Sequence, residues 1–121
     1  NKNNSSIVLY TEMGGLRWLF TGDLEEEGER RLIAEYPDLK IDVLKVGHHG
    51  SQTSSSDLFL DVLSPKLAII SAGKNNRFNH PHQDVVDALE KRKIKILRTD
   101  LSGAITYKFV KGAGTFYVHC P

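Results

Sequence analysis

The apolar positions of this chain alternate between the spacing of strands and the spacing of helices. Short β-favouring runs, bounded by glycine, proline or polar turns, predict strands at residues 7–10, 16–20, 41–46, 66–71, 94–97, 103–110 and 115–119. Apolar residues at helical spacing predict helices at residues 24–36, 58–63 and 83–91. Strands that alternate with helices, with a hairpin at each end of the chain, indicate an α/β (α+β) domain with a mixed β-sheet and flanking helices.

Length, charge and cysteine content restrict the class of protein without selecting a partner. The 121 residues make one domain or a piece of one. The first residue is Asn1 rather than methionine, which suggests the boundary of an excised piece or the remnant of a tag. The net charge of +1 neither supports nor excludes nucleic acid as a partner. No apolar run approaches the roughly 20 residues of a membrane-spanning helix. The single cysteine, Cys120, cannot form an internal disulfide or build a zinc finger.

Three polar loops each follow a predicted strand. They are Thr21-Gly22-Asp23, Gly47-His48-His49-Gly50-Ser51 and Asn79-His80-Pro81-His82. Binding sites of α/β folds assemble where strand ends meet at one edge of the sheet. We therefore expect any chemistry of this chain to lie in these loops.

Asp23 has two interpretations. It lies between a predicted strand and a predicted helix, where a carboxylate commonly caps the helix N-terminus. Alternatively, its carboxylate bridges two divalent cations, since such ions prefer hard oxygen ligands. Taken alone, the capping role is the commoner one.

The neighbouring histidines His48 and His49 predict two different roles. In extended backbone, successive side chains point in opposite directions. One imidazole could then bind a metal while the other faces substrate or orients a ligand. The alternative is an ordinary surface pair, which the flanking Gly47 and Gly50 make less attractive because glycine permits close backbone approach.

The remaining polar candidates also have structural interpretations, which weigh about equally for His80 and His82 and are favoured for Asp100. His80 and His82 lie on either side of Pro81, either in a stiffened loop before the next helix or as substrate-facing proton donors and phosphate contacts. Asp100 has the surroundings of a turn carboxylate, although it could orient a histidine. We interpret His119, in the last predicted strand, as structural.

Taken together, these stretches resemble the second half of the metallo-β-lactamase fold. More narrowly, they resemble the C-terminal domain of competence proteins that internalise DNA. The matching stretches are residues 3–9, 18–23, 44–51, 70–73 continuing to 76, 79–82, and 98–100 continuing to 103–104. Their order and spacing carry the resemblance, because each stretch alone is a weak signal.

The resemblance implies a fold, a metal site and roles for individual residues. The family fold is an αββα sandwich with a two-metal site at its edge, of which this chain would be the C-terminal half. The implied metal ligands are Asp23, which bridges the ions, and one histidine of the pair, for which we favour His49. The other implied roles are catalytic for His48 and His80, substrate-binding for Ser51, Asn79 and His82, and ligand-orienting for Asp100.

One departure from the family limits what this chain can do alone. The family's first metal motif, of the form H-x-[HD]-x-D-H, is missing from these 121 residues, and so is a further histidine ligand. We expect both to lie in an N-terminal half outside this sequence. The intact domain would hold two divalent ions, zinc or manganese, whereas this chain alone would bind metal weakly or not at all. It would also expose apolar surface or form a homodimer.

The resemblance finally implies a function and a location. In the intact protein, the domain would be a metal-dependent phosphodiesterase or nuclease that acts on DNA during uptake, and this chain alone would be inactive. Its partners would be DNA and the rest of its own polypeptide, which includes a membrane-embedded part. The parent protein would lie in the bacterial cell membrane, with this domain on the extracytoplasmic side. The alternatives are a noncatalytic nucleic-acid-binding or scaffold domain and a hydrolase of small esters or lactones.

Overall fold

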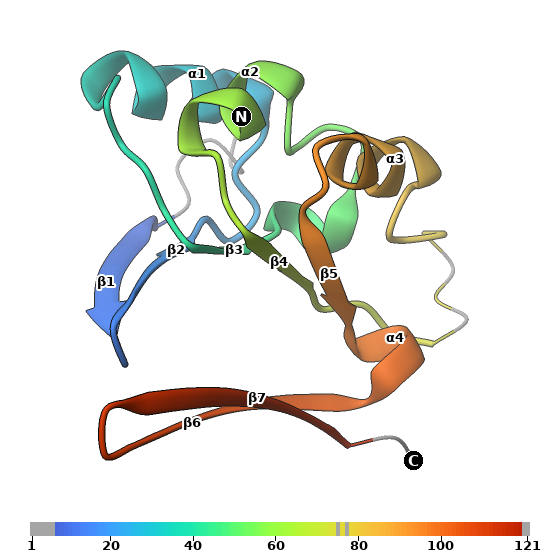
Figure 1. Cartoon of the computed structure of the whole chain (residues 1–121). Coiled ribbons are helices and arrows are strands. Elements are labelled where there is room, and N and C mark those ends of the chain that lie inside the picture. The colour runs from blue at the N-terminus through green and yellow to red at the C-terminus, as the bar shows by residue number, and fades with distance from the viewer. Residues whose placement is uncertain (1–6, 75, 77, 120–121) are drawn as a thin grey trace.

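Five strands form the central sheet, in the order β1-β2-β3-β4-β5 (Figure 1). They are β1 (Leu9–Met13), β2 (Leu16–Phe20), β3 (Val43–Lys45), β4 (Leu67–Ile70) and β5 (Lys95–Arg98). Strand β1 is antiparallel to β2, and the neighbours from β2 to β5 are parallel. The carboxyl ends of four strands therefore meet at one edge of the sheet, where the three polar loops begin.

These features come from a computed structural model that describes residues 7–74, 76 and 78–119. The first residues of the motif at 3–9 and the cysteine Cys120 lie outside the described residues. Within the described ranges, no helix is long and apolar enough to cross a membrane.

Three helices cover one face of the sheet (Figure 1). They are α1 (Glu26–Glu35), α2 (Asp57–Leu63) and α3 (Gln83–Lys91). Helix α1 ends at Glu35, and the capping residue Tyr36 leaves the helical conformation because a residue that precedes proline is disfavoured in helical backbone. The core between the helices and the sheet is made of buried aliphatic side chains and one phenylalanine. Its fully buried members include Leu19, Leu44, Val46, Phe59, Leu60, Leu63, Ile70 and Leu89.

A C-terminal hairpin lies against the other face of the sheet. Its strands, β6 (Ala104–Val110) and β7 (Ala113–His119), pair only with each other. The ring of Trp18 packs against Tyr107 and Phe116, with centroids 5.2 and 5.8 Å apart. The Tyr107 hydroxyl donates to the carbonyl of Gly14 at 2.8 Å, which ties the hairpin to the β1–β2 turn. The chain thus places helices, a sheet and a hairpin in three layers.

The sequence-based prediction of a mixed α/β fold is confirmed. All the predicted strands and helices are present, with ends that differ by a few residues. Two short elements were not predicted: the 3-10 turn η2 (Gly47–Gly50) and helix α4 (Thr99–Ser102). Both lie directly at strand ends, where backbone geometry is set by contacts between loops rather than by apolar periodicity.

Among the exposed apolar side chains of the described residues, two groups lie on the strands and near the end of α1. One group lies on β1 and near the end of α1, and comprises Leu9, Tyr10, Met13 and Tyr36. The other lies on the hairpin, and comprises Phe109, Val110, Tyr117 and Val118. Between β1, β2 and α1 there is also a mostly apolar cavity of about 620 Å³.

Candidate functional site

The three polar loops meet at the carboxyl edge of the parallel strands. The backbone N–H of His48 donates to the carbonyl of Gly22 at 2.8 Å, which joins the loop after β2 to the loop after β3. The N–H of His82 donates to the carbonyl of Gly50 at 2.8 Å, which joins the loop before α3. The expectation that these loops form one site at the sheet edge therefore agrees with their backbone contacts.

Two glycines make this close approach possible. A Cβ atom at Gly47 would lie 2.9 Å from the hydroxyl oxygen of Thr21, and one at Gly50 would lie 2.5 Å from Cβ of Pro81. Gly50 also has a φ of +84°, which disfavours other residues. Glycine at these two positions is therefore required for the loops to pack as they do.

The histidine pair does not have the extended backbone on which its predicted divergence rested. His48 has a φ of 51° and His49 a φ of 54°, so both occupy the left-handed region inside η2. Each such residue costs on the order of 1–2 kcal/mol for a side chain other than glycine, and strain of this kind concentrates at functional sites. The two imidazoles still reach different partners, but the tight turn directs them rather than strand alternation.

The imidazole of His49 is anchored by a hydrogen bond to the backbone. Its Nδ1 lies 2.8 Å from the backbone carbonyl oxygen of Ser71, the residue after β4. A carbonyl can only accept, so Nδ1 carries a hydrogen, and in the neutral imidazole the lone pair is then on Nε2. Ligating histidines are commonly oriented by a hydrogen bond of this kind. The imidazole is exposed, so Nε2 is accessible from outside the fold.

His48 lies on the other side of η2. Its Nδ1 is 3.4 Å from the Thr53 hydroxyl and 3.7 Å from a carboxylate oxygen of Glu25. Its ring stands nearly perpendicular to that of His80, with centroids 5.9 Å apart. The structure therefore brings together the two histidines for which a catalytic role was predicted.

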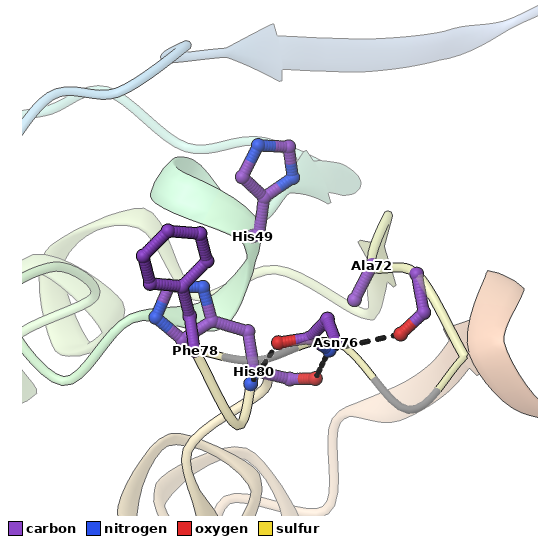
Figure 2. A pocket seen from close by; sticks show the side chains of 6 residues that line it. His49, Ala72, Asn76, Phe78 and His80 are labelled. Carbon is purple, nitrogen blue, oxygen red and sulfur yellow. Dashed lines mark hydrogen bonds between the residues drawn. The ribbon is translucent and has the colours of Figure 1, made fainter.

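Asn76 holds the loop that carries His80. Its side-chain amide donates to the carbonyl of His80 at 2.6 Å and to that of Gly73 at 2.8 Å, and its Oδ1 accepts from the N–H of His80 at 2.8 Å (Figure 2). His80, His49 and Phe78 line a pocket of about 220 Å³ together with Ala72, Gly73 and Asn76. Burial and the neighbouring imidazoles, of which His48 has the largest effect, lower the pKa of His80. A neutral imidazole can accept a proton or a hydrogen bond in this pocket.

Asp23 does not cap helix α1. The helix begins at Glu26 with Glu25 in the capping position, so the capping interpretation is wrong. Asp23 instead lies exposed in a turn closed by the Leu24 N–H, which donates to the carbonyl of Thr21 at 3.1 Å. Its charge acts on Lys45 at the end of β3, whose pKa is lowered by burial and raised in part by Asp23. Asp23 thus remains available as a carboxylate ligand.

The other candidates have structural partners. His82 caps helix α3, because its Nδ1 accepts from the N–H of Asp84 at 3.1 Å. Ser51 is buried, and its hydroxyl lies 3.0 Å from that of Thr53. Asn79, at a φ of 57°, lines a polar pocket beside His80.

Asp100 and His119 lie apart from the histidine pair. Both carboxylate oxygens of Asp100 accept from Arg98, at 3.0 and 2.7 Å, so within the described residues this carboxylate faces a guanidinium rather than an imidazole. Its pKa is lowered, chiefly by that hydrogen bond. His119 pairs across the hairpin with the hydroxyl of Thr106 at 3.2 Å, consistent with a structural role.

Sequence reasoning missed the residues that orient the site. The Ser71 carbonyl, Thr53 and Asn76 determine where the histidines point, and Lys45 and Arg98 contribute its positive charge. Backbone carbonyls leave no trace in a sequence. Lys45 and Arg98 could have been found from their positions at the ends of parallel strands, whereas Thr53 and Asn76 lie further along their loops.

The donor set fits part of a divalent-metal site. A carboxylate and an imidazole with a free Nε2 are ligands that zinc and manganese accept. A catalytic zinc ion normally has three protein ligands. Within the described ranges, no group of three or more His, Cys, Asp or Glu side chains is arranged to hold a metal. Asp23 and His49 could therefore serve as two ligands of a site that other residues complete.

Comparisons with known proteins show the family of this chain. A profile of the family described as Metallo-beta-lactamase superfamily matches residues 1–74. A protein of Bacillus subtilis (strain 168) named ComE operon protein 3 is 54% identical over 121 residues, which are all of this chain and 16% of that relative. Competence protein ComA of Neisseria gonorrhoeae is 44% identical over 111 residues, or 91% of this chain and 16% of the relative. Recombination protein 2 of Haemophilus influenzae is 38% identical over 107 residues, or 88% of this chain and 13% of the relative. This chain therefore spans about one sixth or less of the length of these relatives.

Proposed function

Because this chain belongs to the metallo-β-lactamase superfamily, whose members generally bind divalent metals, we propose that it supplies Asp23 and His49 to a two-metal site that hydrolyses phosphodiester bonds in DNA. The observation that carries the proposal is the hydrogen bond from His49 Nδ1 to the Ser71 carbonyl, which leaves Nε2 free to bind a metal. The exposed Asp23 supplies a carboxylate from the loop that contacts η2.

The rest of the site would come from the remainder of the polypeptide. This chain is then the C-terminal half of an αββα domain, and the other half brings the first ligand cluster and one more histidine. The exposed apolar groups on β1 and on the hairpin support this arrangement, because a covering layer would remove them from water. In the isolated chain, a second copy of the chain could bury these apolar groups by forming a homodimer.

In this proposal, different residues of this chain have different roles in the hydrolysis. When bound, two divalent ions, zinc or manganese, supply an activated water and positive charge at the phosphorus. His80, whose pKa is lowered and whose ring lines the pocket beside His49, contacts the phosphate or takes up a proton. His48, beside His80, faces the leaving group. Asn76 fixes the loop so that these imidazoles do not reorganise during the reaction.

DNA is the proposed substrate for two reasons. The sequence motifs resemble those of competence proteins that internalise DNA, and two of the relatives are named for competence and for recombination. A role in competence-related DNA uptake places the parent protein in the bacterial cell membrane, with this domain on the extracytoplasmic side. The remainder of the parent supplies the membrane-embedded part.

The test is DNA hydrolysis by the full-length protein. We expect cleavage that stops when a chelator is added and returns with zinc or manganese. Asp23→Asn, which preserves the size of the side chain, should abolish both the metal content and the cleavage. Since Asp23 is exposed and caps no helix, that substitution should change the free energy of unfolding by no more than about 0.5 kcal/mol.

Other outcomes would select the alternative functions. DNA binding without bound metal or cleavage would make this a noncatalytic nucleic-acid-binding or scaffold domain. Metal-dependent hydrolysis of carboxylic esters or lactones, with DNA left intact, would support the proposed metal site but show that its substrate is a small ester rather than DNA.

A further inference from the structure

A second, polar pocket continues from the pocket beside His49. It has a volume of about 320 Å³ and shares Gly73, Asn76 and His80 with the first pocket. The other residues that line it are Asn79, Pro81, Gln83, Arg98 and Asp100. The two pockets therefore form one hollow along the edge of the sheet, with the proposed metal ligand at one end and a guanidinium at the other.

Arg98 is held rigidly at its end of this hollow. It is the last residue of β5 and pairs in register with Ile70, the residue before Ser71, whose carbonyl orients His49. Its Nε and one terminal nitrogen donate to the two oxygens of Asp100 at 3.0 and 2.7 Å. The second terminal nitrogen makes no hydrogen bond with a residue that the structure describes.

Because Arg98 lines this pocket, its guanidinium lies where a ligand of opposite charge could reach it. A guanidinium matches a phosphate in shape and charge, and pre-orientation by a carboxylate reduces the entropy lost on binding. The amides of Asn79 and Gln83 line the same pocket and can donate to the same oxygens. A substrate with a single phosphate at the metal end would leave this second pocket empty.

We propose that Arg98 binds a second phosphate of the substrate, next to the one that is hydrolysed, so that the site selects a polynucleotide chain over an isolated phosphodiester. This inference rests on the proposed function, whose site it extends along the same edge. The specificity lies in a residue that does not contact the metals.

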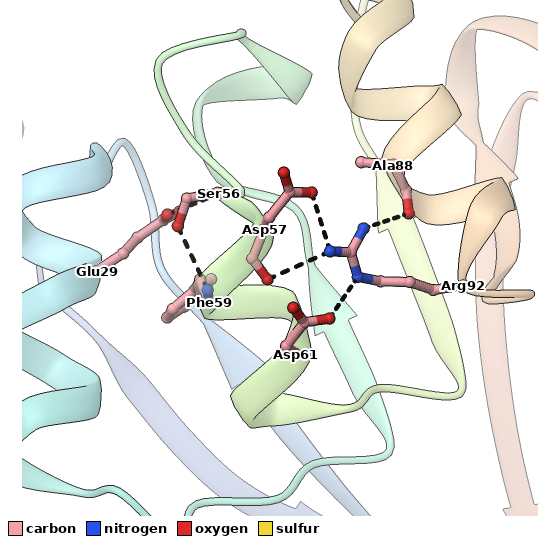
Figure 3. A network of polar contacts seen from close by, with 7 residues as sticks. All are labelled: Glu29, Ser56, Asp57, Phe59, Asp61, Ala88 and Arg92. Atoms are coloured by element: carbon pink, nitrogen blue, oxygen red, sulfur yellow. Dashed lines mark hydrogen bonds and ion pairs between the residues drawn. The ribbon is translucent and has the colours of Figure 1, made fainter.

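Arg92 provides a matched control. It also lies in an ion-pair network, with the carboxylates of Asp57 and Asp61 each at 2.9 Å, and it donates further hydrogen bonds to the backbone carbonyls of Ala88 and Asp57 (Figure 3). That network joins α2 to the end of α3 and lines neither of the two pockets beside His80. Arg92→Gln therefore removes an arginine that is also ion-paired but lies away from the proposed phosphate path.

The experiment compares two substrates of the full-length protein loaded with manganese: a short single-stranded oligothymidylate and bis(p-nitrophenyl) phosphate. Arg98→Gln should lower the ratio of the two kcat/KM values, oligonucleotide over ester, about tenfold, the typical effect of one charge-assisted hydrogen bond. Arg92→Gln should leave this ratio unchanged. Arg98→Lys keeps the positive charge but lacks the planar guanidinium. Its ratio of the two kcat/KM values should therefore lie between those of Arg98→Gln and the unsubstituted protein.

A binding measurement separates a phosphate contact from a structural role. In the presence of chelator, the affinity for a fluorescein-labelled oligothymidylate should fall with rising salt, and Arg98→Gln should reduce the magnitude of that slope by about 0.7, the value for one phosphate contact to a single strand. The proposal would be overturned if Arg98→Gln lowered the activity on both substrates equally and left the salt dependence of binding unchanged. An unchanged ratio of the two kcat/KM values in Arg98→Gln would overturn it as well. If the unsubstituted protein cleaves neither substrate, the proposed function fails, while the salt slope still decides whether Arg98 contacts a phosphate.

Discussion

The Nδ1 atom of His49 lies 2.8 Å from the backbone carbonyl oxygen of Ser71. This hydrogen bond crosses from the turn after β3 to the residue after β4, so it fixes one imidazole between two parallel strands. It also selects the tautomer in which Nε2 has a lone pair. The neighbouring His48 has no such anchor on β4 and turns instead toward Thr53 and His80.

His48→Ala should keep the metal and slow the reaction. Its imidazole lies beside His80 and away from the Ser71 carbonyl, which suits an acid–base group better than a ligand. We expect metal content per full-length chain to be unchanged and kcat for DNA to fall about 10²- to 10⁴-fold. Metal analysis and steady-state kinetics of the purified variant measure the two effects. Loss of metal from His48→Ala, with His49→Ala still loaded, would reverse the two assignments.

Glu29→Ala should destabilise the fold behind the site. The buried carboxylate of Glu29, on α1, accepts from the N–H groups of Ser55 and Ser56 at 2.5 and 2.9 Å. Its removal leaves two backbone donors without partners, which should cost about 2–4 kcal/mol of unfolding free energy. Urea unfolding of the 121-residue chain, followed by the fluorescence of its single tryptophan, Trp18, measures the loss. Glu26→Ala, which removes an exposed pair with Arg30, should cost no more than about 0.5 kcal/mol. Equal losses in both variants would contradict a special role for Glu29.

Asp42 should make stability depend on acid pH. Its carboxylate accepts from the backbone and side chain of Arg17, and the side-chain hydrogen bond lowers its pKa below 3.8. A depressed pKa in the folded state adds stability above the unfolded pKa and loses it as the pH falls through the folded pKa. Asp42→Asn should therefore cost about 1–2 kcal/mol near neutral pH, a range reduced because Arg17 is partly exposed.

The same pair of proteins provides the pH test. The difference in unfolding free energy between the unsubstituted chain and Asp42→Asn should shrink steadily as the pH is lowered below about 4. A difference that stays constant from neutral pH down to the acid transition would show that the ionisation of Asp42 does not contribute.

The 121-residue chain alone should not cleave DNA. In the proposed site it supplies only two of the ligands that two metal ions require, and its sequence lacks the H-x-[HD]-x-D-H cluster. The check is incubation of purified chain with labelled DNA and zinc or manganese, alongside the Asp23→Asn variant to reveal contaminating nucleases. Chelator-sensitive cleavage that is absent from Asp23→Asn would show that the chain builds a complete site.

The fold could be predicted from the sequence because local and long-range preferences agree. The glycines between 13 and 16, the proline after α1 and the apolar spacing of α3 each indicate the element that is found. The position of His82 at the start of α3 was also foreseen as one alternative.

The details of the site were less predictable because contacts between loops decide them. The left-handed backbone of His48 and His49 results from the tight approach of three loops, which no periodicity records. Asp100 was expected to form a turn or to orient a histidine, yet it pairs with Arg98, two residues away, in a short helix that tertiary contacts stabilise. Asp23 looked like a helix cap until the helix was found to begin three residues later.

The most direct test of the central claim is the metal content of full-length protein that carries His49→Ala, with His119→Ala as the matched control. His119 is an exposed histidine in the C-terminal hairpin, bonded to Thr106, and lies outside both pockets beside His80. Elemental analysis should show that His49→Ala loses divalent metal and chelator-sensitive DNA hydrolysis together, whereas His119→Ala keeps both. Full metal content and full hydrolysis in His49→Ala would show that this histidine is not a ligand, and would contradict the site proposed for this chain.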